Sequence, residues 1–334
     1  MHMSTGAAKN TRSGCMLCPR ECGADRESGQ RGRCHADGRI RVARAALHFW
    51  EEPCISGKEG SGAVFFSGCS LGCVYCQNRE ISGGRAGIDI SIDRLSDIFV
   101  ELQDQGANNI NLVTAGHYVP QVTEALRKAK DAGLNIPVVY NSSGYEKTET
   151  LRLLEGLVDI YLPDFKYMDA GLADEYSGAA DYPRTAVSAV REMVRQCPSV
   201  QFDERGIMQR GVIVRHLLLP GHVREAKKII RYLYETYGNQ IYVSIMNQYT
   251  PCGDAAGDPL LRRKVTKREY ERLLDFAAEI GLEQGFYQEG DTAKESFIPP
   301  FDCRGVLPER NREKGVDADT GSRKTEQNVR RPIR

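Results

Sequence analysis

One short stretch, Gly68-Cys-Ser-Leu-Gly-Cys-Val-Tyr-Cys-Gln-Asn78, holds Cys69, Cys73 and Cys76 in the spacing C-x3-C-x2-C. Three thiolates on one loop can bind three irons of a [4Fe–4S] cluster and leave the fourth iron without a protein ligand. A structural metal site would normally close itself with a fourth cysteine or a histidine. The open iron is useful for chemistry, because a small molecule can bind to it directly. A three-cysteine zinc loop and a chance group of buried thiols are the alternatives.

The loop resembles the signature of the radical S-adenosylmethionine (radical SAM) superfamily, in which an aromatic residue precedes the third cysteine, as Tyr75 does here. The apolar run 63–67 predicts a strand that leads into the loop, which fits the same family. The resemblance implies that SAM chelates the open iron of the [4Fe–4S] cluster. It also implies that an electron from the cluster cleaves SAM to a 5′-deoxyadenosyl radical, which abstracts hydrogen from a substrate.

A second group of cysteines, with the spacing C-x2-C-x3-C-x11-C, consists of Cys15, Cys18, Cys22 and Cys34. The segment around them is rich in glycine and poor in large apolar residues, so it cannot build much of a core. Four thiolates would close a tetrahedral zinc site or fully ligate an iron–sulfur cluster. We therefore expect residues 1–47 to form a small metal-binding arm, and the alternative is a flexible arm with free thiols.

The composition limits the class of protein. The 334 residues carry 45 basic and 45 acidic side chains, which gives no general argument for nucleic acid or membrane binding. No apolar run approaches the roughly 20 residues of a membrane helix, and the N-terminus lacks an apolar signal core. Metal-type cysteine spacings without an export signal favour a reducing cytoplasm.

After the arm, strand-like and helix-like patterns alternate. We predict strands over 63–67, 109–114, 136–141, 159–162, 212–219 and 241–246. Helices are predicted over 91–106, 120–133, 147–157, 183–196, 223–237 and 267–280, with Ser91 and Thr266 as N-caps. Such units give parallel strands with right-handed crossovers. The fold class is therefore α/β, a partial (β/α)6 TIM-like barrel over residues 48–303, with a disordered tail over 304–334.

The predicted strands end in polar residues, which matters because parallel barrels bind ligands at the C-terminal ends of their strands. SAM needs a cation for its carboxylate, acceptors for its ammonium and hydrogen-bonding groups for its ribose. The candidate SAM-binding residues are Tyr75, Thr114, Gly116, His117, Asn141, Ser142, Asp164, Lys166, Arg215, Met246 and Asn247. A salt bridge at a strand end is the alternative for Asp164 and Lys166.

Three stretches narrow the resemblance to pyruvate formate-lyase activating enzyme and its homologues: Asp164-Phe-Lys166, Asn141-Ser-Ser-Gly144, and Arg215 before a Leu-Leu-Leu-Pro-Gly turn. This resemblance implies that Asp164, Lys166 and Arg215 bind SAM. The cysteine-rich arm is similar to that of an uncharacterised branch of the family. The Gly-Gly-Glu-Pro motif that holds the SAM ammonium elsewhere is replaced by Thr114-Ala-Gly-His117, so the ligand of the ammonium stays open.

Several further residues have two interpretations each. His48, Glu51 and Glu52 either bind substrate, relay protons or hold the SAM ammonium, or they form a solvent-facing acidic group. His117 either faces SAM or caps the second helix.

The sequence therefore predicts a radical SAM oxidoreductase, with no catalytic residue assigned. The closest resemblance implies activation of a partner enzyme through a glycyl radical, with an electron donor such as flavodoxin or ferredoxin. Modification of a peptide or small molecule is the alternative within this class. A zinc-dependent binding module is the alternative from another class, although residues 1–47 lack the aromatic residues that nucleic acid binding would favour.

Overall fold

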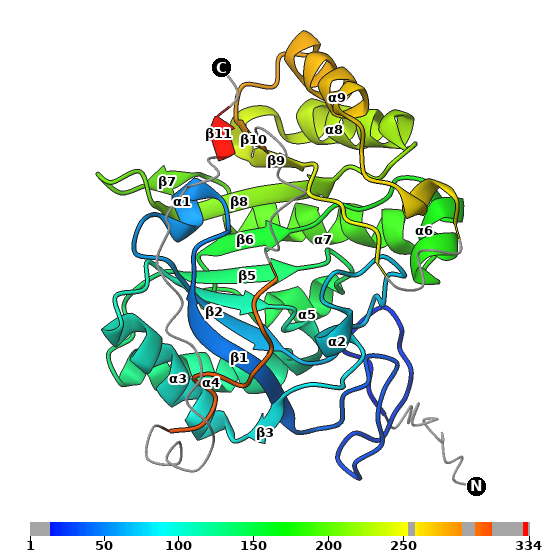
Figure 1. Ribbon diagram of the computed structural model, residues 1–334. Helices are drawn as coiled ribbons and strands as arrows, with labels where there is room; N and C mark the ends of the chain where they lie inside the picture. The colour runs from blue at the N-terminus through cyan, green and yellow to red at the C-terminus, as the bar shows by residue number, and fades with distance from the viewer. Residues whose placement is uncertain (1–13, 253–257, 289–297, 309–329, 333–334) are drawn as a thin grey trace, which may run out of the picture.

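The computed structural model describes residues 14–252, 258–288, 298–308 and 330–332 (Figure 1). Its centre is a sheet with the strand order β11-β10-β9-β8-β6-β5-β4-β2-β1-β3, and β7 pairs with β8. All the pairs between β2 and β10 are parallel, whereas β1, β3, β7 and β11 join antiparallel. The sheet is open, since β11 and β3 lie at its two edges.

The strands have these bounds: β1 Ile40–His48, β2 Ser61–Phe66, β3 Ile88–Ile90, β4 Ile110–Val113, β5 Val138–Ser142, β6 Ile160–Pro163, β7 Gln201–Phe202, β8 Met208–Leu217, β9 Tyr242–Met246, β10 Gly285–Gln288 and β11 Arg330–Pro332. The six predicted strands correspond to β2, β4, β5, β6, β8 and β9, so the open partial barrel is confirmed. The sequence missed β10, a parallel strand of four residues. Its short apolar run carries little periodicity.

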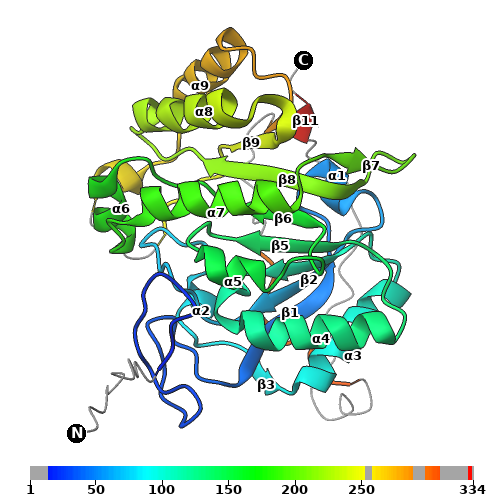
Figure 2. The same ribbon diagram turned by 180° about the vertical axis from the view of Figure 1, so that it is seen from behind.

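The helices are α1 Pro53–Ser56, α2 Arg79–Ser82, α3 Ile92–Asp104, α4 Val119–Asp131, α5 Thr148–Arg152, α6 Ala170–Ser177, α7 Tyr182–Gln196, α8 Val223–Tyr237 and α9 Lys267–Glu279. Figure 2 shows α4, α5, α7 and α8 over one face of the sheet. The Ser91 hydroxyl accepts the Arg94 N–H, and Thr266 forms a capping box with Glu269. Both predicted N-caps are therefore confirmed.

The central strands are buried on both faces. Because they run parallel, their polar carboxyl ends lie at one rim of the sheet. Every residue of β2, β4, β5 and β6 is buried. Most side chains of these strands are apolar, so the polar residues at their carboxyl ends must face something polar. None of the helices in the described ranges combines the length and apolar character that a membrane crossing requires.

The structure differs from the sequence-based prediction at both ends of the barrel. Residues 40–47 were expected in the arm, but they form most of β1, which pairs antiparallel with β2 and β3, and its Arg41 and Arg44 form ion pairs with the distant Asp89 and Asp302. The arm of the structure is therefore residues 14–39. Residues 304–308 were expected in a disordered tail, yet Val306 is fully buried and the Ala45 N–H donates to the Arg304 carbonyl.

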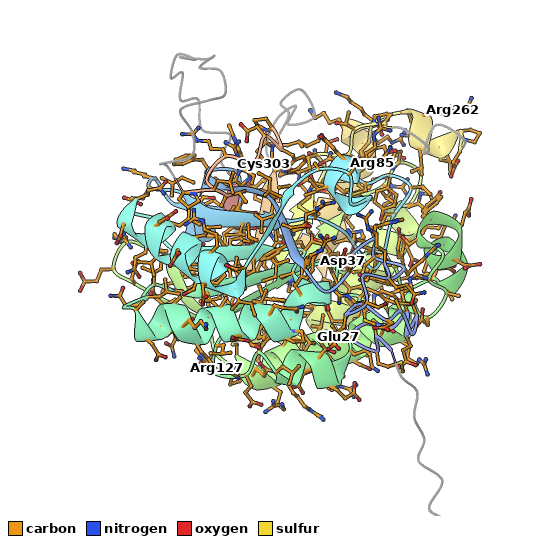
Figure 3. All side chains as sticks on the ribbon, turned by 90° about the horizontal axis from the view of Figure 1, so that it is seen from below. Glu27, Asp37, Arg85, Arg127, Arg262 and Cys303 are labelled. Atoms are coloured by element: carbon orange, nitrogen blue, oxygen red, sulfur yellow. The ribbon has the colours of Figure 1, made fainter. Side chains whose placement is uncertain are left out.

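Residues 330–332 were also assigned to the tail, but they form β11 against β10. The rest of that predicted tail lies outside the described residues. Figure 3 labels Glu27 and Asp37 in the arm and Cys303 in the segment along β1.

Candidate active site

The cluster loop, residues 68–78, follows β2. It begins at Gly68, where any other residue would be strained and would clash with its neighbours. Gly68 has a φ of 99°, and a Cβ atom there would lie 2.5 Å from the Cys34 carbonyl oxygen and 2.9 Å from Nε2 of His117. The loop then carries Cys69, Cys73 and Cys76 along one wall of a cavity of about 220 Å³. The three thiols that the sequence singled out therefore face one space.

The three thiols crowd one another. Burial, together with the Cys76 and Cys73 thiols, raises the pKa of Cys69 to about 12. Burial and Cys73 also raise the pKa of Cys76. Without a cation the thiols of Cys69 and Cys76 are therefore held in their protonated form, and the iron of a cluster would supply the charge that makes them thiolates. The donor set of this loop suits a soft, cationic group.

A chain of hydroxyl groups leads to one of these sulfurs. The Tyr167 hydroxyl donates to the Tyr75 hydroxyl at 2.7 Å and lies 2.9 Å from the Ser177 hydroxyl, which donates to Sγ of Cys73 at 3.1 Å. Tyr75 also packs edge-on against Tyr167 and Tyr176. The aromatic residue of the motif, Tyr75, therefore packs inside the protein and helps to cover the loop. Through Tyr167 it also contacts the Ser177 hydroxyl, which donates to the Cys73 thiol.

A charged network forms another wall of the cavity. Asp164, after β6, accepts hydrogen bonds from Nζ of Lys166 at 2.7 Å and from Nε of Arg215 at 3.0 Å. Arg215, on β8, also donates to Oε2 of Glu51 at 3.0 Å and to the Asn141 side-chain oxygen at 2.5 Å. Strands far apart in the sequence therefore bring two cations and two carboxylates to the same rim.

The network fixes the charges of its members. Burial raises the pKa of Asp164, but Lys166 and Arg215 overcome it and hold that pKa below 3.8. Burial lowers the pKa of Lys166 and of Arg215, and the Asp164 carboxylate more than offsets this effect in both. All three groups are consequently charged at neutral pH. The cavity presents fixed charges of both signs, as a zwitterionic ligand requires.

Thr114 stands at the end of β4 in an unusual conformation. It has a φ of 62°, in the left-handed region that β-branched residues avoid. Its N–H donates to the Asn141 carbonyl, and it lines the cavity together with Asn141 and Ser142. Strain of this kind persists where the surroundings over-determine it, and it gathers at ligand sites.

The structure brings most of the predicted SAM-binding residues to the cavity and leaves three outside its lining. Those that line it are Tyr75, Thr114, Asn141, Ser142, Asp164, Lys166, Arg215 and Met246. His117 is buried behind the cluster loop, where its ring contacts the Ser67 carbonyl at 2.8 Å and burial lowers its pKa to about 4. Gly116 and Asn247 also lie outside the lining.

Glu51 is the main residue whose place the sequence left undecided. Its Oε1 accepts hydrogen bonds from the side-chain amides of Asn111 and Asn141, at 3.1 and 3.2 Å, and its other oxygen binds Arg215. A solvent-facing role for Glu51 is therefore wrong, while Glu52 is fully buried and outside the lining. Asn111 was missed, although an amide inside an apolar strand was a signal.

The family model described as the Radical SAM superfamily matches residues 63–233, which include the cluster loop and the strands of the charged network. An uncharacterised protein of Methanocaldococcus jannaschii is 30% identical over 289 residues, which cover 83% of this chain and 78% of that protein. The chain belongs to the radical SAM superfamily. Membership makes it an enzyme of a superfamily that uses SAM and a [4Fe–4S] cluster, and the three-thiol loop and charged cavity fit both groups.

Solved structures of similar proteins were also found. A domain of the pyruvate-formate lyase-activating enzyme of Bacteroides vulgatus is 11% identical, with a TM-score of 0.37, and the match covers 52% of this chain and 92% of that chain. Streptococcus suis SuiB bound to S-adenosylmethionine is 14% identical, with a TM-score of 0.45. That match covers 67% of this chain and 49% of SuiB.

Proposed function

We propose that this enzyme reductively cleaves SAM in the 220 Å³ cavity and abstracts a hydrogen atom from a substrate. Cys69, Cys73 and Cys76 would hold a [4Fe–4S] cluster. Bound there, such a cluster would supply the one electron that the reductive cleavage of SAM to methionine and a 5′-deoxyadenosyl radical requires, and hydrogen abstraction from the substrate would follow. The observation that carries the proposal is that three crowded thiols and a network of fixed charges line one cavity.

The protein's own groups would bind and orient SAM. Arg215 and Lys166 offer cations to the SAM carboxylate, while Asn141 and Ser142 offer donors and acceptors to its ribose. Glu51 and Thr114 line the same cavity, and they would offer the ammonium a carboxylate and a backbone carbonyl as acceptors in place of the missing Gly-Gly-Glu-Pro motif. Because these groups are already paired and buried, they need little rearrangement on binding.

The preferred substrate in this proposal is a protein, as in an activase that forms a glycyl radical on a partner. A second hollow of about 280 Å³ adjoins the cavity and shares His48, Trp50 and Phe65 with it. Phe49 and Trp50 are 52% and 37% exposed there, and exposed aromatic residues favour contact with a polypeptide. Modification of a peptide or small molecule remains the alternative. The electron donor would be a flavodoxin or ferredoxin of the cytoplasm.

The test is anaerobic. The protein is reconstituted with iron and sulfide, reduced with dithionite and given SAM, and 5′-deoxyadenosine is measured. We expect the wild type and the control Cys303→Ser, whose thiol is outside the cavity lining, to form the nucleoside. We expect Cys73→Ala to form none. Intact SAM in the wild type, with zinc instead of iron on the protein, would overturn the proposal and favour a zinc-dependent binding module.

A further inference from the structure

The four cysteines of the arm lie in one region of the structure, although no three potential ligands among the described residues already have the mutual placement of a metal site. A Cβ atom added to Gly32 would lie 3.1 Å from Sγ of Cys22 and 3.5 Å from Sγ of Cys34. The thiols of Cys15 and Cys22 both act electrostatically on Cys34, and those of Cys15 and Cys34 act on Cys18. Cysteines from both ends of the arm therefore share one small region, although 11 residues separate the third from the fourth.

Apolar packing within the arm contributes little to its shape. Residues 14–39 contain no helix or strand, and their buried apolar side chains are Cys18, Ala24, Cys34 and Ala36. Burial of four such small groups cannot offset the ordering of a segment of this length. Segments of this composition are usually ordered by a disulfide or by a metal.

A buried cation lies beside the thiols. Arg26 is 8% exposed, and its Nη1 lies 3.9 Å from Sγ of Cys15 and donates to the His117 carbonyl at 2.6 Å. The same guanidinium group stacks over the Tyr118 ring at 5.5 Å, and its Nε donates to the Asp37 carbonyl at 3.0 Å. Thiolates bound to a metal carry net negative charge, which a fixed guanidinium stabilises.

The arm is also attached to the cluster loop by hydrogen bonds. The Cys69 N–H donates to the Cys34 carbonyl at 3.1 Å, so a residue of the arm's thiol group binds a residue of the loop's group directly. Arg20 donates to the carbonyls of Ser70 and Leu71 at 2.9 and 3.0 Å, and to that of Ser177 at 2.7 Å. Arg20 thus clamps the loop to the end of α6.

We propose that Cys15, Cys18, Cys22 and Cys34 bind a thiophilic metal centre, either one zinc ion or an iron–sulfur cluster, and that this centre holds the cluster loop in its binding conformation. Metal binding at the four thiols would order the arm and release their protons. The ordered arm then presents Arg20 and the Cys34 carbonyl to the loop. The second part rests on the proposed function, whereas the metal site itself does not.

The metal site is tested without the loop's cluster. The triple variant Cys69→Ala/Cys73→Ala/Cys76→Ala is purified anaerobically, and its zinc and iron are counted. We expect one zinc, or up to about four irons, per chain. Adding Cys22→Ser removes one of the four thiols and should abolish metal binding, and Cys22 is chosen because it is the exposed member of the group. Adding Cys303→Ser should not change the metal content. A triple variant with neither metal, or a metal content unchanged by Cys22→Ser, would overturn the site.

The coupling is tested with the cluster loop intact. In Cys22→Ser we expect amide hydrogen exchange across residues 68–78 to be roughly tenfold faster than in Cys303→Ser, the order expected when an intersegment hydrogen bond is lost. Arg20→Met removes the clamp but keeps the four thiols. It should keep the arm metal and still speed the exchange. Unchanged exchange in both variants would overturn the coupling, whether or not SAM is cleaved.

Discussion

The cluster loop and the arm are both short, rich in cysteine and almost without regular structure, yet their surroundings differ. The three thiols of the loop face a cavity lined by the charged side chains of Asp164, Lys166 and Arg215. Residues of the arm do not line that cavity, and a buried guanidinium, that of Arg26, lies against its thiols. Three thiols facing a cavity suit a group that must accept a ligand, whereas four thiols that can supply every ligand of a metal suit a group that only stabilises structure.

The largest expected effect comes from the charges that face the cluster loop. Asp164→Asn leaves the buried cations Lys166 and Arg215 without their shared carboxylate. We expect a loss of unfolding free energy of about 3 kcal/mol, measured by urea denaturation, and weaker SAM binding. Because the folded-state pKa of Asp164 lies below 3.8, its contribution is present above pH 3.8 and is lost as the pH falls through the lowered value.

The matched control is Asp93→Asn, which removes an exposed carboxylate paired with Lys128 at 2.6 Å. Its urea midpoint should stay at the wild-type value. Equal effects of the two substitutions would mean that the charged wall of the cavity does not differ energetically from a surface ion pair.

The next effect concerns Glu146, which is buried beside the arm. Its carboxyl group lies near the Cys18 thiol, and one of its oxygens sits 2.6 Å from where a Cβ on Gly116 would be. Burial raises the pKa of Glu146 from 4.5 to about 8. The folded state therefore keeps a proton that the unfolded state releases, and stability falls as the pH rises from 4.5 to about 8.

Glu146→Gln should flatten this pH dependence and raise the unfolding free energy at pH 8 by on the order of a few kcal/mol. Urea denaturation at a series of pH values measures it. Glu149→Gln, an exposed glutamate three positions further along the chain, serves as the control. A wild-type slope that survives in Glu146→Gln would show that another group titrates.

A smaller effect is expected on the reduction potential of the loop's cluster, because one of its sulfur ligands accepts a hydrogen bond. Ser177→Ala removes the hydroxyl that donates to Sγ of Cys73 at 3.1 Å. Hydrogen bonds to cluster ligands favour the reduced, more negative state. We expect the reduction potential of the loop's cluster to fall by roughly 40 mV, which corresponds to about 1 kcal/mol for one electron. An EPR-monitored redox titration measures it.

Ser188→Ala is the matched control, since that exposed hydroxyl donates to the Arg184 carbonyl of its own helix. Its potential should equal that of the wild type. A potential for Ser177→Ala within error of this control would mean that the hydroxyl does not act on the cluster.

The smallest effect concerns strain at the rim of the cavity. Thr114→Gly allows the φ of 62° without steric cost but increases the freedom of the unfolded chain. We expect a net stabilisation of at most about 1 kcal/mol in urea denaturation, together with weaker SAM binding because the cradle loosens. A clear loss of stability would show that the threonine side chain, rather than the backbone, holds this turn.

The sequence predicted correctly those features that residues close together in the chain determine by themselves. The spacing of Cys69, Cys73 and Cys76 lies within one loop, and strand ends such as Asp164 and Lys166 follow from parallel topology. The sequence also predicted the central strands, because their apolar runs are continuous. These features could be read without knowing which distant residues they meet.

Other features depend on contacts between distant parts of the chain. Glu51 reaches Arg215 across 164 positions, which no local pattern reveals. Residues 40–47 of β1 were assigned to the metal-binding arm because the partners of their arginines, such as Asp302, lie far away in the sequence. His117 was left between SAM and a helix cap, but its ring contacts the Ser67 carbonyl behind the loop.

The central claim is that the three thiols of the loop hold a cluster with one open iron, and that SAM binds to this iron within the charged cavity. The most direct measurement is the EPR spectrum of the reduced wild-type protein, recorded before and after SAM is added, with the spectrum of the triple variant Cys69→Ala/Cys73→Ala/Cys76→Ala subtracted so that only the loop's cluster contributes. The account predicts about four more irons per chain in the wild type than in the triple variant, and a difference spectrum that changes when SAM binds. An iron-containing protein whose spectrum is unaltered by saturating SAM would contradict it.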